Sequence, residues 1–109
     1  IEKVMLRVAE WVSVAGTMFV VGATRPEVLA EARAVAPEHF FLVPGVGAQG
    51  GDLNAVMECG MTADGGLLIN SSRGILYAGK GDDAIPAARR AAKDLQGTME
   101  RALRAKGVI

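Results

Sequence analysis

The chain has 109 residues, half of them apolar, and its 12 basic and 12 acidic side chains give a formal net charge of zero. This length suits one small domain with a modest core, and the lack of a basic stripe argues against a nucleic-acid partner. One cysteine excludes a disulfide framework and a thiolate metal cluster, and no apolar run reaches the roughly 18 residues that span a bilayer. We therefore expect a cytoplasmic protein without a membrane partner.

The chain opens in an amphipathic pattern that predicts a helix. The apolar positions with the spacing of one helix face are Ile1, Val4, Met5, Val8 and Val12. An apolar run at 17–23 then predicts a strand. Thr24 is placed to cap a second helix, with Glu27 three residues later as its reciprocal partner and Pro37 as its stop. The inner face of that helix is predicted to hold Val28, Leu29, Ala32, Val35 and Ala36.

The same alternation continues to the end of the chain. A strand is predicted at 40–43, a helix from a cap at Asp52 to Gly60, a strand at 67–69 and a helical turn at 74–78. A long last helix follows a cap at Asp82 or Asp83 and ends at Gly107; its inner face is predicted to hold Ile85, Ala88, Ala92, Leu95, Met99 and Leu103. The order α-βα-βα-βα predicts an α/β fold with a parallel sheet and right-handed crossovers.

The loop after the second strand is rich in glycine. Residues 45–50 satisfy the letters G-x-G-x-x-G, but Pro44 precedes them and the helix cap at Asp52 follows them. In a dinucleotide-binding fold the helix begins within the motif, and the next strand ends in an acidic residue rather than in Asn70. A dinucleotide site and a purely structural turn are both weaker interpretations than an anion site, because glycines let backbone N–H groups approach a ligand closely.

The loop after the third strand carries an arginine beside small residues. Arg73 follows Ser71 and Ser72 and precedes Gly74, so its guanidinium and nearby backbone amides can converge on one phosphate. Gln49, from the neighbouring loop, adds an amide donor for a phosphate or a base edge. An ordinary solvated arginine is the alternative for Arg73. In barrel enzymes the last two βα loops often form a phosphate site.

Other chemistry-bearing residues predict no catalytic constellation. His39 precedes a strand, at the end opposite the glycine loop, and is predicted to be structural or solvated. Trp11 and Tyr77 are predicted to be packing residues, and Cys59 a small core residue. No Ser-His-acid set, paired carboxylates or metal-ligand spacing can be assembled, so no catalytic residue and no metal ligand is assigned.

Three segments together resemble a known family. Residues 20–24 (V-V-G-A-T), 43–52 (V-P-G-V-G-A-Q-G-G-D) and 70–73 (N-S-S-R) look like the last three strand ends of the orotidine 5′-phosphate decarboxylases, in the bacterial branch that carries N-S-S-R. The resemblance implies that residues 1–109 are the C-terminal part of one TIM (β/α)8 barrel, with helices on the outer face. It also implies a dimeric enzyme that converts orotidine monophosphate to uridine monophosphate without metal or organic cofactor.

The resemblance assigns roles to residues of both loops. Gln49, Gly50, Ser72 and Arg73 would bind the phosphate, Ser72 through its backbone amide. Pro44, Gly45 and Gln49 would surround the pyrimidine. The family's lysine and aspartate set, centred on D-x-K-x-x-D, is absent from this sequence. We therefore expect this chain alone to be inactive, because binding energy from the phosphate helps only when it is coupled to a reacting centre.

Two alternatives and one expectation about assembly remain. The alternatives are another phosphate-binding barrel enzyme and a non-catalytic phosphate-binding module. The opening helix begins without a cap, so we expect the chain to be a piece of something longer. The uncovered face of a three-stranded sheet predicts a homo-oligomer, or association with the missing N-terminal part, which analytical ultracentrifugation would detect.

Overall fold

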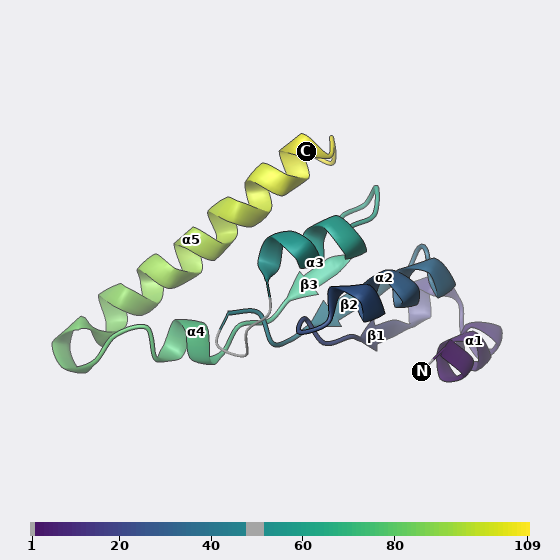
Figure 1. Cartoon of the computed structure of the whole chain (residues 1–109), viewed down its shortest axis with the longest axis horizontal. Helices are drawn as coiled ribbons and strands as arrows, with labels where there is room; N and C mark the ends of the chain where they lie inside the picture. The colour runs from purple at the N-terminus through teal and green to yellow at the C-terminus, as the bar shows by residue number, and fades with distance from the viewer. Residues whose placement is uncertain (1, 48–51) are drawn as a thin grey trace.

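The computed structural model describes residues 2–47 and 52–109, and these form three βα units behind an N-terminal helix (Figure 1). In chain order the elements are α1 (Glu2–Trp11), the 3-10 turn η1 (Val14–Gly16), β1 (Met18–Val20), α2 (Pro26–Val35), β2 (Phe40–Val43), α3 (Leu53–Gly60), β3 (Leu67–Ile69), α4 (Arg73–Leu76), the 3-10 turn η2 (Gly81–Asp83) and α5 (Ala84–Ala105). The predicted alternation of helix and strand is confirmed.

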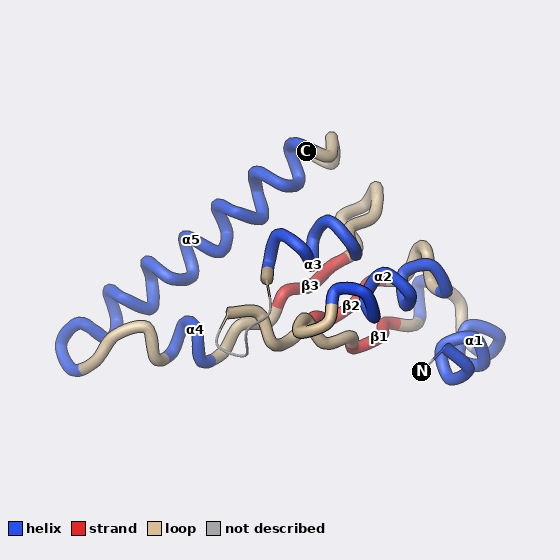
Figure 2. Tube along the Cα trace, in the orientation of Figure 1, coloured by secondary structure: helices blue, strands red, loops and turns tan. Residues whose placement is uncertain are grey.

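The strands form one parallel sheet in the order β1-β2-β3, at the centre of the molecule in Figure 2. Met18 pairs with Phe40, and Phe41 pairs with Leu67. The first strand is shorter than the predicted 17–23, yet the ladder continues past it, because the N–H of Ala23 donates to the carbonyl oxygen of Pro44 at 2.9 Å. The neighbouring strands therefore stay aligned up to their carboxyl ends.

Only one face of this sheet is covered by the described residues. Its helix-facing side chains belong to the core: Phe19, Val21, Phe41, Val43, Leu67 and Ile69. Alternate residues point to the opposite face, as the pleat of a strand requires, and Met18, Val20, Phe40 and Leu68 there are 48%, 64%, 40% and 47% exposed. The helices α2 and α3 lie together on the covered side (Figure 1). This agrees with the outer layer of a barrel, whose inner face meets the remaining strands.

The first helix buries less of its apolar face than its sequence pattern predicts. Met5 is the one buried residue of α1, whereas Val4 is 64% exposed. Ile1, the first member of the predicted face, lies outside the described residues. Trp11 and Tyr77, predicted to be packing residues, are instead 71% and 76% exposed. Both predictions were wrong because the described neighbours offer these side chains no apolar surface to pack against.

The two middle helices differ in how they begin. The predicted cap at Asp52 is confirmed, since its carboxylate accepts from the N–H groups of Asn54 at 2.9 Å and Ala55 at 3.4 Å. The predicted cap at Thr24 is wrong: Arg25 occupies the N-cap of α2 without a side-chain cap, and its Nε donates to Glu27 at 3.0 Å. Within α2 and its C-cap, Leu29, Ala32 and Ala36 are buried as predicted.

The last helix follows its predicted extent but not all of its predicted contacts. Asp83 holds the N-cap position of α5, yet its carboxylate makes no cap and accepts from Arg90 Nη2 at 3.3 Å. Ile85, predicted on the inner face, is 84% exposed, whereas Ala87 is buried. Leu95 packs against the core, and Gly107, with φ at +78°, follows the helix as predicted. The first turn of α5 thus reaches the core through Ala87, and Ile85 points away from it.

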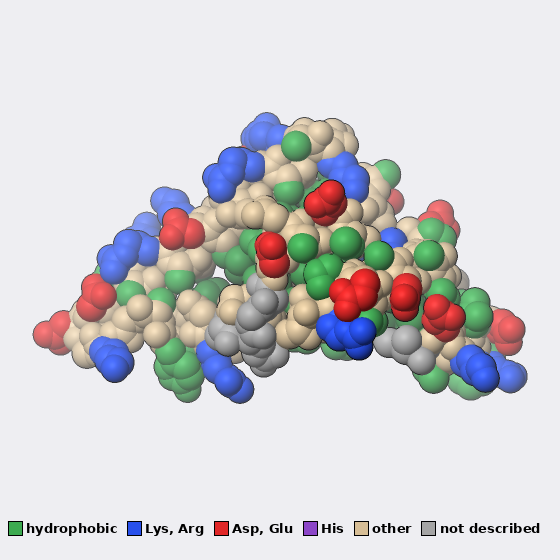
Figure 3. Space-filling view, in the orientation of Figure 1, with side chains coloured by type: hydrophobic (Ala, Val, Ile, Leu, Met, Phe, Trp, Pro, Cys, Tyr) green, Lys and Arg blue, Asp and Glu red, His purple; other side chains and the backbone are tan. Residues whose placement is uncertain are grey.

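Charged side chains cover the helical layer rather than the sheet. In Figure 3, Lys and Arg side chains follow α5, while acidic side chains gather over α2. Three exposed ion pairs are formed within the described residues, by Arg25 with Glu27, Arg90 with Asp83 and Arg104 with Glu100. Such exposed pairs contribute little to stability. The helical layer therefore has the polar outer surface expected of a barrel's exterior.

At the amino end of the sheet, Arg33 of α2 holds several chain segments together. Its guanidinium donates to the carbonyl oxygens of Gly60 (2.8 Å), Ala36 (3.0 Å), Gly66 (3.0 Å) and His39. The Cζ atom also lies 3.9 Å from the centre of the Phe41 ring. Burial lowers the pKa of Arg33, since desolvation disfavours the charged form. Arg33 thereby joins the end of α3 to the starts of β2 and β3.

The imidazole of His39 lies inside this end of the molecule. The residue is 5% exposed, its ring centre is 5.2 Å from that of Phe19, and neither ring nitrogen has a hydrogen-bond partner among the described residues. The prediction that His39 is structural or solvated is thus resolved in favour of a buried packing residue.

Candidate functional site

The loops after β2 and β3 meet at the carboxyl ends of these strands. Val43 pairs with Ile69, so the register brings Pro44 beside Asn70, and the N–H of Asn70 donates to the carbonyl oxygen of Val43 at 3.1 Å. In open and closed parallel α/β sheets, ligands bind at this end of the strands. Pro44 and Asn70, the first residues of the two loops, therefore lie at adjacent positions of the sheet.

A small cavity of about 190 Å³ lies between the two loops. Its lining comprises Pro44, Gly45 and Val46 from the loop after β2, and Asn70, Ser71, Ser72 and Arg73 from the loop after β3. The structure thus brings together Pro44 and Gly45 with Ser72 and Arg73, as the sequence predicts. Gln49 and Gly50 lie outside the described residues.

Glycine is required in the first of these loops by its backbone. Gly45 and Gly47 have φ angles of +93° and +80°, a region that side chains with a Cβ avoid. Between them, Val46 is 6% exposed and packs into the core. The loop is consequently fixed by one buried side chain while its glycine backbone lines the cavity.

Arg73 is the only charged side chain that lines this cavity within the described residues. It is exposed and forms no ion pair or side-chain hydrogen bond with another described residue. The N–H of Ser72 likewise has no acceptor among them, although the carbonyl oxygen of Ser72 accepts from the N–H of Leu76 at 2.8 Å. One positive charge and a free backbone donor suit an anionic group of the size of a phosphate.

The sequence reasoning did not assign Asn70 and Ser71, which also line the cavity. The signal for Asn70 was available in the strand pattern, because side chains two residues apart share one face of a sheet. Asn70 follows Leu68 in this alternation, on the face away from the helices, and both are exposed. A polar residue that continues an otherwise apolar row at a strand's carboxyl end marks a ligand-facing position.

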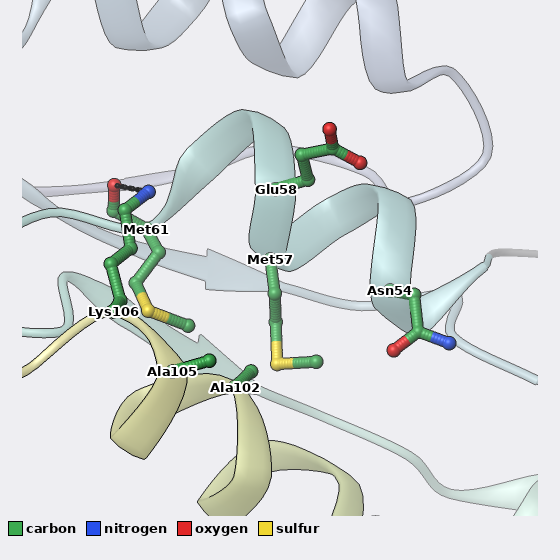
Figure 4. Close-up of a pocket in the computed structure, with 7 residues that line it drawn as sticks. All are labelled: Asn54, Met57, Glu58, Met61, Ala102, Ala105 and Lys106. Carbon is green, nitrogen blue, oxygen red and sulfur yellow. Dashed lines mark hydrogen bonds between the residues drawn. The ribbon is translucent and has the colours of Figure 1, made fainter.

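A larger hollow, of about 310 Å³, separates α3 from the end of α5 (Figure 4). Met57 and Met61 extend from α3 toward Ala102 and Ala105 of α5, and Lys106 Nζ donates to the carbonyl oxygen of Met61 at 3.4 Å. Thioethers and methyl groups dominate this surface, and it lies between two helices rather than at the strand ends. Its one cation among the described residues, Lys106, donates to a backbone carbonyl, and Glu58 adds a negative charge to the lining, so this hollow suits an anion less well than the cavity at Arg73.

Among residues 2–47 and 52–109, no three His, Cys, Asp or Glu side chains are grouped so that they would hold a metal ion. Within the same residues, every helix is too short or too polar to cross a bilayer.

Comparison with known proteins gives matches to orotidine 5′-phosphate decarboxylases. No protein-family model matches the chain. It is 46% identical over 104 residues to the orotidine 5′-phosphate decarboxylase of Bacteroides fragilis, which covers 95% of this chain and 38% of that protein. It is 55% identical over 93 residues to the enzyme of the same name from Azoarcus sp., covering 84% of this chain and 34% of that protein.

Solved structures give the same result. The chain matches Leishmania donovani UMP synthase with a TM-score of 0.72 and 41% identity, over 90% of this chain and 22% of that one. It matches Leishmania donovani OMP decarboxylase with a TM-score of 0.69 and 38% identity, over 90% and 38%. The chain thus spans well under half the length of the relatives that it matches.

Proposed function

This chain is related, along nearly its whole length, to a segment of the orotidine 5′-phosphate decarboxylases, and from this relationship we propose that it is the C-terminal part of such an enzyme. The proposed reaction converts orotidine monophosphate to uridine monophosphate and carbon dioxide. The observation that carries the proposal is the shared cavity, because Pro44 and Gly45 line it together with Ser72 and Arg73. The sequence similarity and the three βα units of a barrel support it.

In this proposal the chain binds the nucleotide. Arg73 pairs with the phosphate dianion, and the N–H of Ser72 donates a hydrogen bond to it. Pro44 and Gly45 present apolar and backbone surface to the pyrimidine. Gln49 and Gly50 complete the phosphate site in the loop between β2 and α3. A guanidinium suits this task, since its planar set of donors matches two phosphate oxygens at once.

The bond-breaking step requires groups that this chain lacks. Loss of carbon dioxide leaves a carbanion at C6, which must be stabilised by a nearby cation and then protonated. The lysines of this chain lie outside the strands: Lys3 in α1, Lys80 before η2, Lys93 in α5 and Lys106 at the end of α5. We propose that earlier strands supply these groups and that this chain contributes the binding energy that positions the substrate.

The proposal is tested by restoring the missing part. A chimaera is made from the Bacteroides fragilis enzyme by replacing its matching segment with this chain. We expect the chimaera to decarboxylate orotidine monophosphate, and the isolated chain to show no turnover. A chimaera that folds but fails both to bind uridine monophosphate and to turn over would reject the assignment.

The role of Arg73 has its own test in the same chimaera. Arg73→Ala should weaken binding of uridine monophosphate about 100-fold, the loss expected for charge-assisted hydrogen bonds, and leave binding of free uridine unchanged. Arg25→Ala removes an exposed arginine from the start of α2 and serves as the control. Equal losses for both ligands would show that Arg73 does not bind the phosphate.

We further propose that the enzyme works in the cytoplasm as a homodimer, without metal or organic cofactor. Support for this comes from the family resemblance. Sedimentation of the active chimaera at twice its monomer mass would agree with the dimer.

A further inference from the structure

The open face of the sheet is arranged in layers that change character toward the carboxyl end. Along the strands, the pair Met18 and Phe40 is followed by Val20, Leu42 and Leu68. Two residues further, the continuing register places Gly22, Pro44 and Asn70 in one row. The lower rows are large and apolar, as in the filled interior of a barrel. The last row, Gly22, Pro44 and Asn70, has one residue without a side chain, one proline and one amide. These three residues are called the floor of the cavity.

Gly22 has no structural explanation within the described residues. Its φ angle is not positive, and a Cβ built on it would have no heavy atom within 4 Å. Glycine in a strand costs stability relative to alanine, and it often marks a place where a ligand approaches the backbone. Gly60 gives a contrast, because a Cβ there would lie 3.1 Å from side-chain atoms of Leu29 and Leu67.

Among the described residues, Asn70 is the one member of this row with a hydrogen-bonding side chain. Its backbone N–H donates to the carbonyl oxygen of Val43, but its side-chain amide makes no hydrogen bond with another described residue. It lines the cavity beside Pro44, three positions before Arg73. The amide is neutral, so it can lie near a phosphate dianion without the repulsion that a carboxylate would cause.

We propose that Asn70 is a specificity-determining residue that hydrogen-bonds the nucleoside half of the bound nucleotide, and that Gly22 is a glycine because the same nucleoside lies over it. This inference rests on the proposed function, since it requires a nucleotide whose phosphate is held by Arg73. It assigns the ligand's two halves to different side chains of one cavity. Asn70 and the floor receive the sugar and base, and Arg73 receives the phosphate.

The experiment measures binding of uridine and of uridine monophosphate to the chimaera by isothermal titration calorimetry. Asn70→Ala should weaken both ligands by the same factor, about tenfold for one lost hydrogen bond. Asn70→Asp keeps the size of the side chain but adds a negative charge, so it should weaken uridine monophosphate more than uridine. Asn54→Ala is the matched control, because this exposed asparagine of α3 does not line the cavity, and it should change the binding of neither ligand.

Gly22→Ala separates a ligand role from a structural one. Because the added methyl group meets nothing among the described residues, we expect the chimaera to fold with an unchanged urea midpoint of unfolding, while both ligands bind at least about tenfold more weakly. Unchanged binding in Gly22→Ala, or in both Asn70 variants, overturns the inference while Arg73→Ala still supports the proposed function. A chimaera whose binding is insensitive to Arg73→Ala contradicts the proposed function itself, and the inference fails with it.

Discussion

The two ends of the sheet are built from similar residues but use their polar groups differently. At the amino end, Arg33 donates to the carbonyl oxygens of four residues, and the imidazole of His39 is buried. At the carboxyl end, Arg73 and Asn70 are exposed and their side chains have no partner among the described residues. An arginine surrounded by backbone acceptors stabilises the fold, whereas one beside an empty cavity is available to a ligand.

This contrast shows why the type of a residue does not reveal its role. Arg33 and Arg73 have the same donors, and only their surroundings separate a structural role from the binding role that we propose. Barrel enzymes commonly divide their two ends in this way, with stability at the amino ends of the strands and function at the carboxyl ends. The following variants, made in the chimaera, test that division.

The largest effect is expected at Arg33. Arg33→Ala leaves several carbonyl groups without their donor and removes a contact with Phe41, so it should lower the free energy of unfolding by roughly 3 kcal/mol. Urea denaturation followed by circular dichroism measures the loss. Arg33→Lys keeps the charge but not the fork of donors, and should recover less than half of it. A loss below about 1 kcal/mol for Arg33→Ala would break the comparison between the two ends.

A moderate effect is expected at Asp52, which shows that the carboxyl end also contains structural residues. Asp52→Ala removes the N-cap of α3 and should cost about 1 kcal/mol of stability in the same urea experiment. Asp52→Asn retains a side-chain oxygen for the cap and should cost much less. If the two variants lost equal stability, the charge of Asp52 rather than its cap would be responsible.

A smaller effect on stability is expected at Arg73. Since its side chain contacts no described partner, Arg73→Ala should change the free energy of unfolding by less than about 0.5 kcal/mol, although it weakens nucleotide binding. Thermal melting with and without uridine monophosphate measures both properties. We expect the ligand-induced rise in melting temperature to disappear in the variant. A variant that melts much earlier without ligand would assign Arg73 a structural role.

The smallest effect is expected at Glu27. A backbone hydrogen bond at the start of α2, and then the Arg25 side chain, hold the pKa of Glu27 below its ordinary value of 4.5. A carboxyl with a lowered pKa in the folded state contributes stability above its unfolded pKa and loses it as the pH falls through the folded value. Glu27→Gln should therefore melt slightly earlier than the parent at pH 7, and the difference should shrink as the pH falls. A difference that grew toward low pH would contradict this sign.

Much of the fold was predictable because it depends on local chemistry. Apolar runs separated by glycine and proline fixed the alternation of strands and helices, and Asp52 caps a helix through atoms only two and three residues away. The same local reasoning failed at two predicted caps. Arg25 binds Glu27, the predicted partner of Thr24. Arg90 binds the carboxylate of Asp83, which was itself the predicted cap. Such competition depends on how side chains meet in space.

The sequence by itself determined the order of the elements, the two loops of the candidate site and the presence of Arg73 in one of them. Only the tertiary structure decided that Asn70 joins the two loops in lining the cavity, that Arg33 stabilises the opposite end, and that Ile85 and Trp11 stay exposed. The reason is physical. Helices and caps arise from neighbours in the chain, whereas burial, cavities and the partners of a guanidinium arise from residues brought together by parallel strand pairing, which joins positions more than 20 residues apart.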